Sequence, residues 1–295
     1  MQETNKAELA TLSRMFSATV FRELAAKGRS PLLSRLLRRT RLSSEGDLGR
    51  PLRTAFDEAF QILRMLGHRD EYIYRSAIAQ KIVIGKHRLN AAMVTELRAG
   101  SSKADVVVLN GTATVYEIKS ERDSFARLES QIADYRRVFG AVNVITSPGQ
   151  VDSVRDMIPD DVGLIQLSRE YSLQTVREAC SQPWRTSPIM LLETLRASEA
   201  ISLLAGLGVS VPDVPNTQLR GELRRLFADQ DPSAVHDQMV EVLRQTRSHR
   251  DLNQFVGSVP TSLHASVLAI RPGARDRSTL VGALDQTVAT AIAWS

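Results

Sequence analysis

Residues 103–119 read KADVVVLNGTATVYEIK and contain two β-rich runs on either side of an Asn-Gly turn signal. Valine-, threonine- and tyrosine-rich runs bounded in this way are typical of a β-hairpin. We therefore expect strands over 105–109 and 114–119, with an aspartate opening the first and Glu-Ile-Lys closing the second. Because side chains alternate along a strand, Glu117 and Lys119 lie on the same face.

The position of Asp105 relative to that face depends on the register of the hairpin. A two-residue loop pairs Leu109 with Thr112 and places Asp105 opposite Tyr116, so that Glu117 falls on the other face. An odd-numbered loop, or one bulge, instead places Asp105 directly opposite Glu117. We expect the odd loop. It gathers two carboxylates and a lysine on one face, which is a site for a hard divalent cation.

An aspartate near a turn, followed by (Asp/Glu)-x-Lys on the partner strand, resembles the PD-(D/E)XK nuclease superfamily with its restriction-endonuclease-like fold. The surrounding residues are similar to one bacterial branch of that superfamily, and they match it in the same order along the chain. The matching residues are Glu96, Lys103-Ala104-Asp105, Glu117-Ile118-Lys119-Ser120, Asp123, Arg127-Leu128, Gln131 and Tyr135. The likeness covers roughly residues 70–170 and departs at Ala104, where the superfamily name has proline.

Phosphodiester hydrolysis needs an activated water and cations that absorb charge on the phosphorus centre. Asp105 and Glu117 would supply carboxylates to Mg²⁺ or Mn²⁺, and the resemblance adds the backbone carbonyl of Ile118 as a ligand. Lys119 can orient the attacking water or neutralise developing charge. The resemblance also implies that Gln131 positions that water or a phosphate. The catalytic set is therefore Asp105, Glu117, Lys119 and Gln131.

Several roles have two interpretations. Glu96, expected on the last turn of a helix over 88–99, is either a further metal ligand or an ordinary exposed helix residue. Arg127 and Tyr135 recur with Gln131 at i, i+4 and i+8 on the next helix. They either decorate the surface or line the active site and contact nucleic acid. For the site as a whole, the alternative is a cross-strand salt bridge on an exposed sheet face.

Composition excludes several classes of protein. The 295 residues are 43% hydrophobic, yet no apolar run approaches the roughly 20 residues that span a bilayer. The N-terminus lacks the pattern of a signal peptide, and the single Cys180 excludes an internal disulfide. We expect a cytoplasmic protein with no membrane partner. There is no phosphate-binding loop with lysine, no Gly-x-Ser-x-Gly and no metal-ligand spacing among the histidines.

Positive charge is concentrated in residues 22–53, which carry nine Lys and Arg against Glu23, Glu45 and Asp47 in a chain of net charge +5. Basic density of this kind is expected where a protein contacts nucleic acid. The residues assigned to that contact are Arg35, Arg38, Arg39 and Arg41. The alternatives are a solvated helix face, or arginines that pair with acidic residues inside a helical bundle.

The order of elements predicts three regions of an α/β protein. Residues 1–69 form a basic helical region, and residues 70–170 form the nuclease-like core, a small mixed sheet with flanking helices. Strands are expected over 141–146 and 162–167, with a helix over 150–158 between them. Residues 171–295 form a C-terminal helical region that begins with a helix over 173–180.

The function expected from these features is a metal-dependent nuclease acting on DNA, although the residues do not distinguish DNA from RNA. The resemblance suggests service in phage defence or to a mobile element. The helical flanks would grip substrate or form a homodimer. The alternative is a non-catalytic nucleic-acid-binding or protein-interaction module that retains the nuclease fold.

Overall fold

The computed structural model describes residues 6–44, 46 and 48–295, so Glu45 and Asp47 of the basic segment lie outside the described residues. The chain divides into two compact units. Unit 1 comprises residues 1–82 and 250–295, and unit 2 comprises residues 83–249. Each unit is described separately below.

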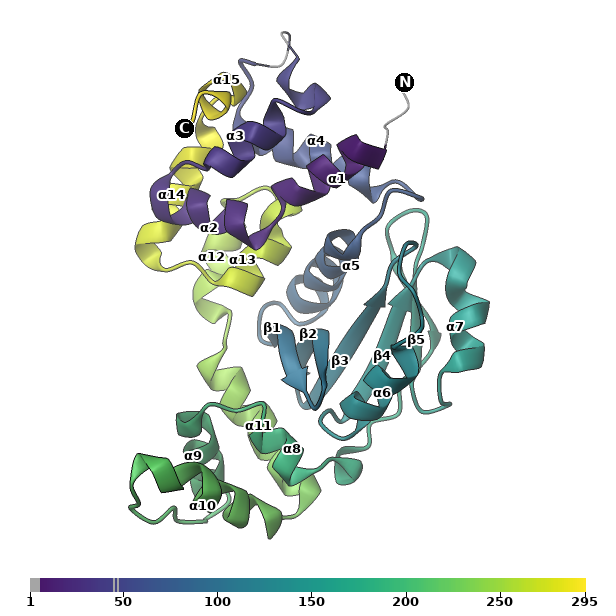
Figure 1. Cartoon of the computed structure of the whole chain (residues 1–295), viewed down its shortest axis with the longest axis vertical. Helices are drawn as coiled ribbons and strands as arrows, with labels where there is room; N and C mark the ends of the chain where they lie inside the picture. Colours follow the sequence, from purple (N-terminus) through teal and green to yellow (C-terminus); the bar gives the residue numbers. More distant parts are fainter. Residues whose placement is uncertain (1–5, 45, 47) are drawn as a thin grey trace. The chain divides into compact units, whose positions relative to one another are not determined.

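Unit 2 is built on a six-stranded mixed sheet with strand order β1-β2-β3-β4-β5-β6 (Figure 1). Strands β1 to β3 pair antiparallel, β3 to β5 pair parallel, and β6 returns antiparallel on β5. The strands are β1 (Ala92–Ala99), β2 (Ser102–Asn110), β3 (Thr112–Lys119), β4 (Ala141–Thr146), β5 (Gly163–Leu167) and β6 (Leu173–Arg177). The predicted mixed α/β class, with a mixed sheet and flanking helices, is confirmed.

Two helices connect the parallel strands and cover the sheet. Helix α6 (Leu128–Arg136) follows β3 and packs on β2 and β4, and α7 (Val151–Met157) follows β4 and packs on β5 (Figure 1). Both contribute apolar side chains to one core, with Ile132 and Val154 buried beside the valines of β2 to β4. Every second side chain of a strand faces this core. A polar side chain at one of these inward-facing positions is therefore buried with it.

The rest of unit 2 is helical. Helix α11 packs against β2 and β3, and it also contacts α8 and α9, while α10 packs on α8 and α9. Figure 1 shows these four helices in green as one cluster. They are α8 (Pro188–Leu192), α9 (Ala197–Gly206), α10 (Asn216–Ala228) and α11 (Pro232–Thr246).

Two predicted helices are strands in the structure. The helix expected over 88–99 is replaced by β1, and the helix expected over 173–180 is replaced by β6. Both segments mix helix formers with β-branched residues, so their local preference is weak. The edges of β2 and β5 offer unpaired backbone groups, and pairing with those edges decides the outcome because exposed edges are costly. The strands expected over 141–146 and 162–167 are confirmed as β4 and β5.

Unit 1 is helical and is assembled from both ends of the sequence. Helix α14 packs on α2 and α15 packs on α3, so the purple and yellow helices of Figure 1 lie side by side. The helices are α1 (Lys6–Met15), α2 (Ala18–Lys27), α3 (Pro31–Leu37), α4 (Leu52–Arg64), α5 (Glu71–Ala77), α12 (Asn253–Val256), α13 (His264–Ile270), α14 (Ala274–Asp285) and α15 (Val288–Ile292). A π-helical stretch, η3 (Ile78–Lys86), continues α5 across the boundary between the units.

Backbone hydrogen bonds join the two ends of the chain in unit 1. The N–H of Leu52 donates to the Gln286 carbonyl at 2.8 Å, and the N–H of Val288 donates to the Arg50 carbonyl at 3.0 Å. Residues 1–82 and 250–295 therefore form one unit, while residues 171–249 of the predicted C-terminal region belong to unit 2. Within the described part of the chain, no helix combines the length and apolar character needed to cross a bilayer.

Candidate active site

The hairpin has the odd register. Leu109 pairs with Ala113 and Val106 pairs with Tyr116, which makes Asp105 and Glu117 the next residues facing each other. Gly111 lies at the tip with φ of +73°, a conformation that glycine adopts without the strain a side chain would add. The alternative two-residue loop, which pairs Leu109 with Thr112, does not form.

The pairing between β1 and β2 is interrupted at Asp105, the residue of β2 that faces Glu117 on its other side. Thr95 pairs with Val106 and Leu97 with Ala104, so the unpaired position between them brings Glu96 opposite Asp105. Glu96 has a left-handed backbone, with φ of +56°, which no regular strand residue adopts. The prediction that Glu96 ends a helix is therefore wrong, because this residue lies within β1.

The Asp105 side chain forms a hydrogen bond with the backbone of β3. Its Oδ2 accepts a hydrogen bond from the backbone N–H of Ile118 at 2.8 Å. This fixes the Asp105 side chain beside the Glu117-Ile118-Lys119 segment, in agreement with the predicted neighbourhood of these residues.

Glu117 and Lys119 form an ion pair that is almost completely buried. Lys119 Nζ lies 2.9 Å from Glu117 Oε1, and the two residues are only 6% and 1% exposed. Lys119 Nζ also donates to Gln131 Oε1 at 2.9 Å, which joins α6 to the end of β3. The alternative of a salt bridge on an exposed sheet face does not describe this pair, since α6 covers it.

Tyr135 completes the hydrogen bonding of Glu117. Its hydroxyl donates toward Glu117 Oε2, at 2.7 Å, and toward the Lys103 carbonyl, at 2.9 Å. Burial, followed by the negative charges of Glu117 and Asp105, raises the pKa of the Tyr135 phenol, so the hydroxyl keeps its proton and remains a donor. Tyr135 is fully buried. The predicted contact between Tyr135 and nucleic acid is therefore wrong for this structure, and its role is to hold Glu117.

Glu96 and Arg127 lie at the exposed margin of the site. The Glu96 carboxylate pairs with Lys103 Nζ at 2.7 Å, and both side chains are about three-fifths exposed, at 60% and 61%. Arg127 is exposed at the N-cap of α6. Contacts of Arg127 with nucleic acid, and of Glu96 with a metal, stay predictions.

The donors near Asp105 fit a hard cation in their chemistry. Across the described residues, His, Cys, Asp and Glu side chains form no group of three or more that could hold a metal ion. The predicted ligands are the carboxylates of Asp105 and Glu117, the Ile118 carbonyl and, as a further carboxylate, Glu96. This all-oxygen set leaves other positions to water and phosphate, as magnesium prefers. Each carboxylate oxygen accepts more than one partner, so the bonds from Lys119 and Tyr135 do not exhaust Glu117.

A second polar cluster at the end of β4 had no sequence signal. The Thr146 hydroxyl lies 2.9 Å from the Lys119 carbonyl and 2.9 Å from Gln150 Oε1, and the Ser147 hydroxyl donates to the same Gln150 oxygen at 3.0 Å. Parallel pairing of Lys119 with Thr146 brings this cluster next to Lys119. The sequence alone does not reveal this cluster, because Thr146 and Lys119 are 27 positions apart and only the strand register brings them together.

The four predicted arginines of the basic segment belong to unit 1 and have different surroundings. Arg41 forms a two-pronged ion pair with Glu8, with Nε–Oε1 and Nη2–Oε2 distances of 3.0 and 2.8 Å. This hydrogen bonding also lowers the pKa of the Glu8 carboxyl. Arg41 therefore pairs inside the helical bundle, as the alternative expected, and its contact with nucleic acid stays a prediction. Arg35, Arg38 and Arg39 are exposed.

Fold and site together define an α/β protein whose mixed sheet carries a buried Glu-Lys pair next to an aspartate. The sequence model of the family described as bacteriophage P4 protein cII matches residues 65–263, and the chain belongs to this family. Protein cII of Enterobacteria phage P4 is 25% identical over 172 residues, which are 56% of this chain and 56% of that protein. The chain thus spans about half the length of this curated relative.

Among solved structures, the chain is similar to SPO1766, a protein of unknown function from Silicibacter pomeroyi. The identity is 21% and the TM-score 0.31, over 45% of this chain and 87% of that one.

Proposed function

We propose that this chain is a metal-dependent nuclease with a restriction-endonuclease-like core, in which Asp105, Glu117 and Lys119 carry the chemistry. The observation that supports this most directly is the odd register of the hairpin, which sets Asp105 beside Glu117. The same strand end carries Lys119, with its Nζ held between Glu117 and Gln131. A carboxylate pair beside an ammonium group suits hydrolysis of a phosphodiester.

In this proposal Asp105, Glu117 and the Ile118 carbonyl would hold Mg²⁺ or Mn²⁺. When bound, the ion supplies positive charge to the phosphate and lowers the pKa of a water. Lys119 stabilises charge that develops on the phosphate oxygens or orients the attacking water, and Gln131 fixes the position of its ammonium group. Tyr135 holds the Glu117 carboxylate in one orientation. Preorganised groups of this kind favour the transition state because they need no rearrangement during the reaction.

The buried state of Glu117 favours a second candidate, a binding or interaction module that retains the fold without catalysis. Lys119 and Tyr135 already give each Glu117 oxygen a partner, so the buried carboxylate is paired without a metal. The phage origin of the curated relative fits service to a mobile element under either candidate.

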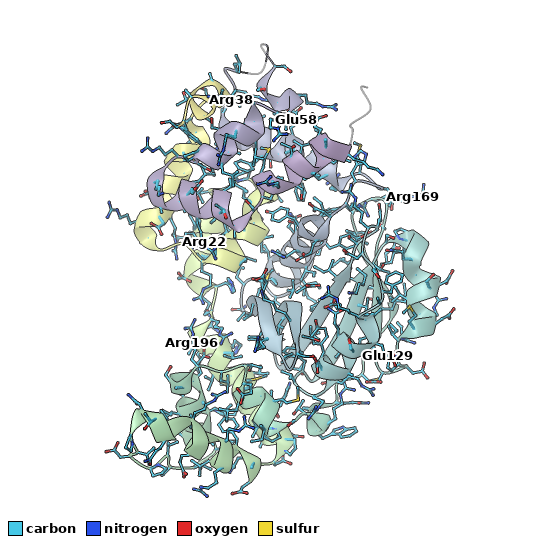
Figure 2. The ribbon with its side chains drawn as sticks, in the orientation of Figure 1. Arg22, Arg38, Glu58, Glu129, Arg169 and Arg196 are labelled. Carbon is cyan, nitrogen blue, oxygen red and sulfur yellow. The ribbon has the colours of Figure 1, made fainter. Side chains whose placement is uncertain are left out.

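A cleavage assay distinguishes the two candidates. Purified full-length protein would be incubated with plasmid, linear duplex, single-stranded DNA and RNA, with and without Mg²⁺ or Mn²⁺. We expect metal-dependent cleavage that falls about a hundredfold or more in Asp105→Asn and Glu117→Gln. The matched control is Glu129→Gln, which removes an exposed carboxylate from α6 and should leave cleavage unchanged (Figure 2).

Cleavage that persists in both site variants would place the activity elsewhere. No cleavage of any substrate by the folded protein would favour the non-catalytic module.

A further inference from the structure

Charge is distributed unequally between the two units. Residues 1–82 and 250–295 hold 19 Lys and Arg against 12 Asp and Glu, a net charge of +7. Residues 83–249 hold 19 against 21, a net charge of −2. The unit with the carboxylate site therefore has no excess of positive charge with which to attract a polyanion, whereas the helical unit does.

Part of the positive charge in unit 1 is used to hold the helices together. Arg41 pairs with Glu8, Arg50 with Glu58 and Arg53 with Asp285. The Arg41–Glu8 pair connects positions 33 residues apart, and the Arg53–Asp285 pair connects the two ends of the chain. A guanidinium engaged with a carboxylate in this way contributes less to the external field, because its charge is already neutralised.

A group of five further cations lies on α2, on the short link to α3, on α3 itself and on the turn that follows it, and we call this group the α2–α3 surface. Within the described part of unit 1 they are exposed and no carboxylate pairs with them. These five are Arg22, Lys27, Arg29, Arg35 and Arg39. Arg38 is also exposed, and its Nη2 donates to the Ile292 carbonyl at 2.6 Å. Figure 2 labels Arg22, which lies on α2, and Arg38, the C-cap residue of α3.

The α2–α3 surface has little negative charge and a rigid base. Glu23 is the only acidic residue of α2, and its Oε2 accepts a hydrogen bond from Ser30 at 2.6 Å. The Ser34 hydroxyl and Arg38 both donate to the Ile292 carbonyl, which fixes α3 on α15. Less side-chain and backbone freedom is therefore lost when a ligand binds.

The apolar side chains of the same helices point inward. Val20, Phe21 and Leu24 of α2, like Leu33, Leu36 and Leu37 of α3, are buried in unit 1. In the described residues, the exposed large hydrophobic side chains all lie outside 18–39. A helix that binds a membrane surface inserts an exposed apolar face, and this surface has none. Its chemistry suits a hydrated array of phosphates.

We propose that the α2–α3 surface binds the phosphate backbone of nucleic acid without reading its sequence. Each Lys or Arg that neutralises a phosphate releases condensed counterions, which makes affinity strongly dependent on salt. This binding does not depend on the carboxylate site being catalytic. It places nucleic-acid affinity in unit 1, independently of what unit 2 does to the bound strand.

The test compares two variants with equal loss of charge, in the full-length protein and with a chelator present to prevent cleavage. The first variant replaces the five exposed cations of the α2–α3 surface by Gln. The control variant replaces five exposed cations of unit 2 by Gln, chosen because among the described residues they too form no ion pair with a carboxylate, namely Lys86, Arg88, Arg98, Arg137 and Arg196. Binding to a labelled duplex DNA, a duplex RNA and a single strand is measured at three salt concentrations.

We expect the slope of log affinity against log salt on duplex DNA to become less negative by up to about 4.5 in the first variant, at roughly 0.9 for each lost contact. The control should retain the slope of the unaltered protein. Arg35→Gln with Arg39→Gln alone, which leaves α2 intact, should change it by about 1.8. This double variant still tests the proposal if the variant with five substitutions fails to fold.

An unchanged slope in a folded α2–α3 variant would overturn the proposal, and so would an equal change in the control. Binding to anionic lipid vesicles in preference to any nucleic acid would overturn it as well. If Asp105→Asn and Glu117→Gln leave cleavage intact while the salt slope behaves as expected, only the proposed nuclease site fails.

Discussion

At the scale of single residues, the site depends on an ion pair taken out of water. Glu117 and Lys119 lose hydration because α6 covers them, and they regain interaction energy only from each other, Gln131 and Tyr135. A buried ion pair adds little net stability to a fold, because the cost of removing both ions from water offsets their attraction. Removing one partner, however, leaves a buried charge without compensation. The site residues therefore affect folding as well as chemistry.

We predict that Lys119→Met destabilises the protein by about 3–5 kcal/mol, because Glu117 is then buried without a cation. The double variant with Glu117→Gln should cost less than the sum of the two single changes, since neither charge remains. Urea unfolding of the four proteins measures this coupling. The control is Lys103→Met, which breaks the exposed pair with Glu96 and should cost about 1 kcal/mol or less. Additive effects at Glu117 and Lys119 would contradict the ion pair.

At the scale of elements, a histidine joins α11 to the hairpin. The buried His236 accepts a hydrogen bond at Nε2 from the backbone N–H of Ala113, at 3.2 Å. Its Nδ1 lies 3.0 Å from Asp237, and a side chain at Gly140 would collide with its ring at 2.7 Å. Protonation of Nε2 would remove the acceptor, so α11 is held on β3 by the neutral form.

This geometry predicts a pH dependence of stability. Burial lowers the pKa of His236 below its ordinary 6.5, and the Asp237 carboxylate opposes the shift without cancelling it. The unfolded chain therefore binds a proton at a higher pH than the folded one does. The contribution of His236 is fully present above about pH 6.5 and is lost as the pH falls below that value.

We expect the unfolding free energy to fall between pH 7 and pH 5, and the fall to be smaller in His236→Gln. Denaturant titrations at several pH values measure both curves. Burial also lowers the pKa values of His87 and His264, so some dependence should remain in the variant. Identical pH curves for the two proteins would exclude a contribution from His236.

At the scale of the whole molecule, the first and last parts of the chain stabilise one another. Helix α14 packs on α2 and α15 on α3, and the Arg53–Asp285 pair joins the same regions. Leu280 and Leu284 of α14 are buried in this contact region. Loss of the C-terminal helices would therefore expose the apolar side of α2.

We predict that truncation after Gly273 unfolds or loosens unit 1 and leaves the sheet of unit 2 folded. Amide hydrogen exchange should show lost protection in α2 and α3, and retained protection in β2 to β4. The α2–α3 surface should lose its nucleic-acid binding at the same time. Retained protection of α2 in the truncated protein would contradict this account.

The elements that the sequence predicted best are those with strong local patterns. The hairpin strands and β4 are rich in β-branched residues, and β5 is a short apolar run. The predicted helices at 88–99 and 173–180 failed because their local preference is weak. An edge of the sheet that needed a partner decided the structure there.

The sequence by itself determined that a hairpin carries an aspartate near Glu-Ile-Lys, and that positive charge is concentrated near the N-terminus. The alternation of side chains along a strand and the local density of charge depend only on neighbouring residues, so they can be predicted without knowing the tertiary contacts. The tertiary structure decided the register that sets Asp105 beside Glu117, the burial of the ion pair, and the use of Arg41 in the helical bundle. Strand register, burial and ion pairing depend on which distant segments pack against each other, and the local sequence does not specify those segments.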